Sequence, residues 1–355
     1  MRGRGRGATL AAAALAAAMI AAGCESAMPT SAPASSTPVV SGPPVAASSP
    51  SASVVPVASS AAPASSPSAA PAATPPATLV AVAGTPSLPY AVSRAVAFAD
   101  GTAILVCGGL TATGTTATVL RVNLAGGAAT PVGRLADPVH DAAGGVVGGV
   151  RLLLGGGRTT QDATAQRVTV SGSTVVGRLP APRADLAAVA VRSELIVAGG
   201  AAGGVSDRSV LATTVGRRYR VVATLPVGVR YAATAALDGR VYLFGGSDGV
   251  HDLATIQVID PVADTARIAG RLPRSLSHAT AFVLDGRLFI AGGRHAGRAV
   301  DTILGFDPAT GAVAPAGHLP RALSDAAAVV VGGNAWLVGG EAATLLTSLV
   351  ELTPG

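Results

Sequence analysis

Apolar and polar positions alternate in blocks along this chain, and residues 272–293, LPRSLSHATAFVLDGRLFIAGG, show the pattern most clearly. A short polar loop precedes an apolar run at 279–284, a turn at Asp285–Gly286, a second apolar run at 288–291 and a glycine pair. Glycine accepts the positive φ of a tight hairpin turn, so the block predicts two antiparallel strands. A third strand is expected to end at 306–308, and a weaker fourth strand follows the next turn. Each block therefore predicts four short antiparallel strands.

The block recurs along the chain at a nearly constant interval. Its opening leucine is found at Leu88, Leu135, Leu179, Leu225, Leu272 and Leu319. The successive intervals are 47, 44, 46, 47 and 47 residues, and a glycine pair follows each leucine at a similar distance. Repeats of about 40–50 residues with four strands each are typical of β-propellers. The copies therefore predict six blades.

The last copy lacks a fourth strand, which the N-terminal side of the array can supply. The copy ends after its third strand, at 345–352, whereas residues 78–83, TLVAVA, precede Leu88 as TARIAG precedes Leu272. Pairing between the two ends would remove the open edges of the first and last sheets. We therefore expect an all-β fold. It is a six-bladed β-propeller of four-stranded antiparallel blades over residues 78–355, closed by an N-terminal strand that pairs with the last blade.

These repeats resemble the kelch-repeat family, which includes galactose oxidase-like propellers. Kelch blades carry two glycines after the second strand and a D-P-x-T-G-like turn further on. The segment Asp307–Gly311 fits that turn well and Asp260–Pro261 fits it in part. The usual Tyr after the glycines and Trp opening the fourth strand are replaced, the latter region holding residues such as Ile268 and Val313. The resemblance spans about residue 79 to the C-terminus and implies a propeller.

The N-terminal sequence predicts secretion. Residues 1–23 combine three arginines with an alanine-rich apolar run at 8–22, which is typical of a signal peptide and short for a membrane span of about 20 residues. The ending Ile20-Ala21-Ala22-Gly23-Cys24 resembles the bacterial lipoprotein cleavage motif, which implies a lipid on Cys24. Plain cleavage and a retained anchor are the alternatives. A diacylglycerol supplies two acyl chains, enough for stable anchoring on the extracytoplasmic face of the cell membrane.

Residues 24–77 predict a disordered tether. The stretch 25–77 holds 12 of the 25 prolines, much Ala and Ser, and the single charge of Glu25. It has too few large apolar side chains to offset the entropy cost of ordering.

Composition excludes several chemistries. The chain has no lysine, which rules out a P-loop lysine or a Schiff base. Aromatic residues make up 3% of the chain and the arginines are interleaved with carboxylates, so we expect no nucleic-acid binding.

Three kinds of residue invite a functional interpretation but favour a structural one. The glycines at 155–157 follow a predicted strand, which favours blade geometry over a phosphate loop. Cys107 lies in an apolar run and is expected in the core. The histidines lack metal-ligand spacing, so we expect no metal. We also expect no cofactor and a monomer.

Propeller geometry places the candidate site on one face, where the loops entering the innermost strands meet the loops after the glycine pairs. The polar positions there include Ser93, Ser277 and Ser324, with Arg158, His295 and Glu341 on the same rim. The ligand-binding candidates are Arg94, His140, Asp141, Arg183, Asp185, Arg230, Tyr231, His278, Arg294 and Asp325.

Two interpretations of this set remain open. The side chains could satisfy one another and line a water-filled channel. Alternatively, they could bind an anionic or polyhydroxyl ligand, because planar Arg guanidinium groups match carboxylates. The second interpretation predicts a binding or interaction module, without enzymatic activity, for an unknown protein or carbohydrate. A carbohydrate-active enzyme is the alternative: bacterial N-acetylneuraminate mutarotase is also a six-bladed kelch protein, which implies a sugar-acid mutarotase.

Other enzymes with related propellers match less well. The copper site of galactose oxidase needs two His and a Tyr crosslinked to Cys, and no such arrangement maps onto this sequence. The S-x-D-x-G-x-T-W box of sialidases does not occur either.

Overall fold

The computed structural model of the chain describes residues 77–355, and all regular secondary structure in that range is β-strand. The predicted signal peptide, the lipid on Cys24 and nearly all of the tether lie outside the described residues. Between residues 77 and 355 there is no helix of the length and apolar character that a membrane span requires. The predicted all-β class is confirmed.

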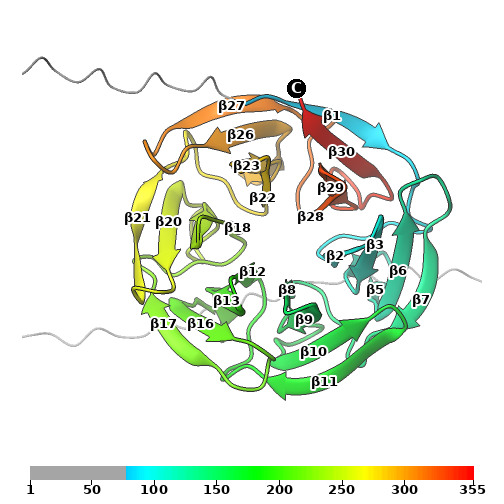
Figure 1. Cartoon of the computed structure of the whole chain (residues 1–355), viewed down its shortest axis with the longest axis horizontal. Helices are drawn as coiled ribbons and strands as arrows, with labels where there is room; N and C mark the ends of the chain where they lie inside the picture. Colours follow the sequence, from blue (N-terminus) through cyan, green and yellow to red (C-terminus); the bar gives the residue numbers. More distant parts are fainter. Residues whose placement is uncertain (1–76) are drawn as a thin grey trace, which may run out of the picture. The chain divides into compact units, whose positions relative to one another are not determined.

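The sheets are arranged around a centre, and in each four-stranded sheet one edge strand lies innermost and the other outermost (Figure 1). Three four-stranded sheets each have their strands in chain order. The first has the order β12 (Ala187–Val191), β13 (Glu194–Ala198), β16 (Ser209–Thr213) and β17 (Arg220–Thr224). The second has β18 (Ala233–Leu237), β19 (Arg240–Phe244), β20 (Thr255–Asp260) and β21 (Thr265–Arg271). The third has β22 (Thr280–Leu284), β23 (Arg287–Ala291), β26 (Thr302–Phe306) and β27 (Val313–His318).

A fourth four-stranded sheet combines the two ends of the described chain. Its order is β1 (Leu79–Gly84), β30 (Leu349–Pro354), β29 (Asn334–Val338) and β28 (Ala327–Val331). Strand β1 runs antiparallel to β30, from Leu79 opposite Pro354 to Gly84 opposite Leu349. In Figure 1 the C-terminus accordingly lies beside β1 at the outer edge of the ring.

The remaining large sheet has eight strands. Its order is β2 (Val96–Asp100), β3 (Ala103–Cys107), β6 (Thr118–Asn123), β7 (Thr130–Arg134), β11 (Gly172–Arg178), β10 (Thr164–Thr169), β9 (Val150–Leu154) and β8 (Ala143–Val147). Its two halves meet through a single parallel pair, Gly172 with Arg134. Three two-stranded ribbons lie in loops: β4 (Leu110–Thr111) with β5 (Gly114–Thr115), β14 (Ala201–Ala202) with β15 (Val205–Ser206), and β24 (Arg294–His295) with β25 (Arg298–Ala299).

The hairpin predicted at Asp285–Gly286 forms between β22 and β23, with Leu284 opposite Arg287. Asp285 and Gly286 have φ values of 48° and 70°, as a two-residue hairpin turn with two left-handed residues requires. Local sequence therefore determines the register of this pair.

Each glycine pair holds one repeated unit against the next. The N–H of the second glycine donates to a carbonyl oxygen in the following unit, as from Gly246 to Leu276 at 2.8 Å. A Cβ on the first glycine, Gly245, would lie 2.0 Å from that same oxygen. Corresponding donors at Gly109, Gly156, Gly200, Gly293 and Gly340 bond to Val139, Arg183, Val229, Leu323 and Val92. The glycines are thus needed for close approach of neighbouring units, and the predicted blade role is confirmed over the phosphate-loop alternative.

The core lies between neighbouring sheets. The six opening leucines are at most 4% exposed. One core cluster joins Trp336 of the last unit to Ile104 of the first, so the two ends of the array share buried apolar surface. Cys107 is 1% exposed in β3, as predicted, and burial raises the pKa of its thiol to about 12.

Candidate functional site

One residue from each repeated unit contributes to a closed ring of backbone hydrogen bonds at the centre of the molecule. Each ring residue stands just before the innermost strand of its sheet and has φ between 54° and 59°. The ring residues are Arg94, Asp141, Asp185, Tyr231, His278 and Asp325. The N–H of each donates to the carbonyl oxygen of the ring residue in the preceding unit, and Arg94 donates to Asp325, at 2.9–3.1 Å. The left-handed conformation is well tolerated by Asp, which fills three of the six positions.

The loops behave as the sequence predicts. In every unit the residue before the ring position pairs with a residue that follows the glycine pair. These bridges are Ser93 with Leu110, His140 with Gly157, Ala184 with Ala201, Arg230 with Ser247, Ser277 with Arg294, and Ser324 with Glu341. The two sets of loops therefore meet on one face around the centre.

The ring residues and the residue after each of them line a cavity of about 180 Å³. The following residues are small in five of the units, and Leu186 takes this position in the remaining one. The small ones are Ala95, Ala142, Ala232, Ala279 and Ala326. The cavity thus combines polar groups from the ring with an apolar wall.

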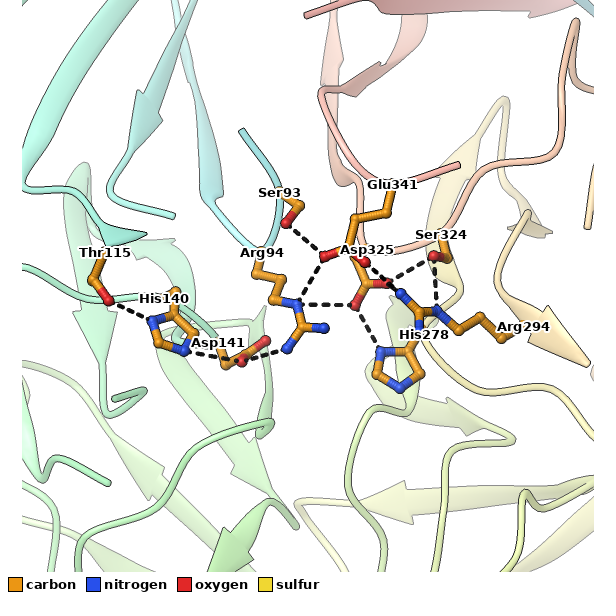
Figure 2. Close-up of polar contacts among 10 residues, drawn as sticks. All are labelled: Ser93, Arg94, Thr115, His140, Asp141, His278, Arg294, Ser324, Asp325 and Glu341. Carbon is orange, nitrogen blue, oxygen red and sulfur yellow. Dashed lines mark hydrogen bonds and ion pairs between the residues drawn. The ribbon is translucent and has the colours of Figure 1, made fainter. Parts of the chain in front are cut away.

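On one side of the cavity the arginines are neutralised by carboxylates (Figure 2). Arg94 bonds through Nη1 to Asp141 at 3.2 Å and through Nε to Glu341 at 3.1 Å. Arg294 donates through Nη2 to Asp325 at 2.9 Å and also to Glu341. Two guanidinium groups therefore face three carboxylates, and this side carries no surplus positive charge.

Asp325 is the most buried carboxylate of this network, with a side chain 4% exposed. Burial opposes its ionisation, but a hydrogen bond with His278 Nδ1 at 2.7 Å, one from Ser324 and the charge of Arg94 hold its pKa below the ordinary value. Asp325 is therefore ionised at neutral pH.

The opposite side of the cavity holds a carboxyl group that titrates near neutrality. Burial, and next the charge of Asp141, raise the pKa of Asp185 to about 7, although the Tyr231 hydroxyl donates a hydrogen bond to it. Burial also raises the pKa of Asp141, against the opposing charge of Arg94. Tyr231 keeps its proton, because burial and the neighbouring carboxylates raise the pKa of its phenol. This side therefore offers the carboxyl of Asp185 and the hydroxyl of Tyr231, next to Asp141, which is bonded to Arg94.

Two of the residues that line the cavity form an aromatic pair. The rings of Tyr231 and His278 stack with centroids 3.9 Å apart, and the Arg230 guanidinium lies 5.6 Å from the Tyr231 centroid. The stack fixes both ring orientations, since His278 is also tied to Asp325.

The structure brings most of the predicted candidates together. The ring residues line the cavity, and Arg294 bonds to one of them. His140 lies next to the ring, with Nε2 3.6 Å from Asp141. Arg230 does not line the cavity, because its guanidinium bonds the carbonyl of Gly249 in the loop after its glycine pair.

The prediction for Arg183 is wrong. Arg183 is 3% exposed and reaches into its own unit, where it bonds Ser209 and the carbonyl of Gly199 and lies 3.2 Å from Asp207. Its position in the repeat explains this, because the equivalent residues are buried and apolar: Val92, Val139, Val229, Leu276 and Leu323. Alignment of the six units would have identified Arg183 as a core position. Glu341 was predicted on the rim because it follows a glycine pair. Its bonds to Arg94 and Arg294 were not predicted from the sequence.

Within residues 77–355 no three His, Cys, Asp or Glu side chains are grouped so that they could hold a metal ion. Two of the cavity carboxylates, Asp141 and Asp325, are instead bonded to arginines.

Comparison with known proteins agrees with the repeat and the fold. The Kelch motif matches residues 229–265, so the kelch resemblance is confirmed. The solved structure of YjhT is similar with a TM-score of 0.66 and 13% sequence identity, over 76% of this chain and 96% of that one. At this identity the likeness concerns the fold, a β-propeller of kelch type. No curated protein sequence matches the chain.

Proposed function

We propose that this protein is a binding module whose central cavity holds a small, neutral, polyhydroxylated ligand such as a monosaccharide. The observation that carries the proposal is the cavity itself, which receives one polar residue from every unit. Hydroxyl groups of sugars can donate to the Asp141 and Asp185 carboxyls, and the stacked Tyr231–His278 pair offers an aromatic surface. The volume of about 180 Å³ is below the roughly 300–1,000 Å³ of drug-sized sites, which suits a ligand of one sugar ring.

Charge decides between a neutral and an anionic ligand. Arginine forks were expected to hold an anion, yet Arg94 and Arg294 are already paired with Asp141, Asp325 and Glu341. An added carboxylate would lie near ionised acids in a partly desolvated site, which is unfavourable.

A stability screen tests this function. The purified protein is heated with neutral monosaccharides and polyols, and with the uronic acids that correspond to them. A ligand at 100 times its dissociation constant stabilises the folded state by about 2.7 kcal/mol. We expect a neutral sugar to raise the unfolding midpoint and its uronic acid to raise it less. A panel in which only anions stabilise the protein would overturn the proposal.

A carbohydrate-active enzyme, such as a sugar-acid mutarotase acting at the same cavity, is the second candidate. One observation favours it: an acid with a pKa of about 7 can both donate and accept a proton at neutral pH, as interconversion of anomers requires. The test is the rate of anomer interconversion followed by NMR. A rate that is accelerated by the protein and lost in Asp185→Asn would make the protein an enzyme.

The blade count forms part of the proposal: a six-bladed propeller closed by β1. Six ring residues, six glycine-mediated contacts and the pairing of β1 with β30 support it. The eight-stranded sheet is interpreted as two blades, because only the pair Gly172–Arg134 connects its halves.

The domain organisation and location complete the proposal. Residues 1–23 are a signal peptide, Cys24 carries the lipid, residues 24–77 are a tether, and 78–355 form a monomeric propeller on the extracytoplasmic face. The motif ending at Cys24 supports this arrangement. Cell fractionation tests it: the protein should sediment with membranes, and Cys24→Ala should release it or block its processing. Equal membrane association of both forms would refute the lipid anchor.

A further inference from the structure

A second cavity lies in the first unit, where Pro138 of the second unit borders it, and differs from the central one in its chemistry. Its volume is about 490 Å³, within the roughly 300–1,000 Å³ range of small-molecule sites. Its wall is unusually rich in hydroxyl groups: five threonines contribute, from the ribbon β4–β5 and the start of β6. They are Thr111, Thr113, Thr115, Thr116 and Thr118.

The threonine hydroxyls are arranged by the chain itself. Thr111 Oγ1 donates to the carbonyl of Gly114 at 2.8 Å, and Thr116 Oγ1 donates to Thr118 Oγ1 at 3.0 Å. Both donor oxygens also accept a backbone N–H, Thr111 Oγ1 from Thr113 and Thr116 Oγ1 from Thr118. A hydroxyl oxygen has two acceptor lone pairs, so Thr116 Oγ1 can still accept one bond from a ligand hydroxyl. Tyr90, only partly buried, adds an aromatic ring to the same wall.

Arg134 supplies the cation of this cavity. It is exposed at the end of β7, lines the cavity and forms no ion pair with any residue of the described range. The contrast with the centre is direct, because the guanidinium groups of Arg94 and Arg294 are paired with carboxylates. A planar guanidinium without a partner matches a carboxylate in a two-bond geometry.

We infer that this cavity, lined by the five threonines, Tyr90 and Arg134, is a second binding site that takes an acidic saccharide of about two sugar rings. The threonine hydroxyls bond the sugar hydroxyls, Tyr90 packs against a ring face, and Arg134 binds the carboxylate. The inference does not depend on the function of the central cavity. The two cavities are nevertheless neighbours: His140 contacts Thr115 at 2.8 Å on one side and Asp141 at 3.6 Å on the other (Figure 2).

The experiment is calorimetric titration of the purified protein with digalacturonic acid, and in parallel with its neutral methyl ester and with polygalacturonate. We expect the acid to bind, the ester to bind at least tenfold more weakly, and Arg134→Gln to weaken binding of the acid at least tenfold. Arg287→Gln is the matched control: Arg287 is exposed, opens β23 beside the Asp285–Gly286 turn and has no ion pair within residues 77–355, so its loss should leave binding unchanged.

Several results would overturn the site. The first is the absence of binding, and the second is equal affinity for the acid and the ester. The third is equal affinity in Arg134→Gln and the parent protein. The fourth is loss of binding in Ala279→Leu, because that substitution fills the central cavity and would place the acid there. Arg134-dependent binding of either the disaccharide or the polymer supports it. The comparison of these two shows whether the saccharide is recognised free or within a chain.

Discussion

The backbone N–H of Arg94 donates to the carbonyl oxygen of Asp325 at 3.0 Å, which connects the first repeated unit to the last. The same two residues interact through their side chains, with Arg94 Nε 3.7 Å from Asp325 Oδ1. The residues that close the ring through their backbones therefore also line the central cavity with their side chains. The left-handed backbone conformation of each ring residue sets the direction of its side chain.

The ring geometry predicts a difference between two substitutions at Tyr231, whose φ is 56°. Both Tyr231→Gly and Tyr231→Val remove the stack on His278, but only valine is β-branched and strained at this φ. Left-handed geometry costs L-residues roughly 1–2 kcal/mol, partly offset by the greater unfolded-state entropy of glycine. We expect the valine variant to unfold at lower urea concentration. Identical midpoints would mean that the ring backbone rearranges freely.

The glycine pairs predict a cost that arises from close approach. Gly245 and Gly203 have nearly equal φ values, 60° and 59°, yet a Cβ at Gly245 would lie 2.0 Å from Leu276 O whereas nothing lies within 4 Å of one at Gly203. Alanine at either position carries the same backbone strain. We expect Gly245→Ala to lose at least about 2 kcal/mol more than Gly203→Ala in urea unfolding. Similar losses would show that the units are not held by this contact.

Asp185 predicts a pH dependence of stability. Its pKa is about 7 when folded and near 3.8 when unfolded, so between these values the folded state binds more protons. The contribution of Asp185 to stability therefore falls as pH rises from about 4 to 7 and is constant above. Asp185→Asn removes this effect while keeping a residue that tolerates positive φ. The two proteins should be equally stable near pH 4, and the variant more stable at pH 8 by on the order of 1–3 kcal/mol. Parallel stability profiles would argue against a raised pKa.

Most of the fold could be predicted because each requirement is local and repeated. The apolar runs around Asp285–Gly286 contain their own turn, and the spacing of leucines and glycines repeats it in each unit. The glycine pairs are identifiable because close approach of neighbouring units admits no Cβ, as at Gly245.

The site was only partly predictable because adjacent positions of one loop face different environments. Arg183, Ala184 and Asp185 are consecutive, yet the first enters the core of its unit, the second pairs with the loop after the glycines, and the third lines the cavity. Single residue types do not reveal this alternation, whereas the repeat alignment does. The pairing of Arg94 with Glu341 joins residues far apart in the sequence and needs the closed ring.

The most direct test of the account is titration of the best-stabilising neutral sugar into the parent protein and into Ala279→Leu. Ala279 lines the central cavity beside His278, and the equivalent position of the third unit already holds Leu186, so the repeat accommodates leucine there. We predict that Ala279→Leu unfolds at a midpoint close to that of the parent and loses sugar binding at least tenfold. Unchanged affinity in a folded variant would contradict the central cavity as the binding site.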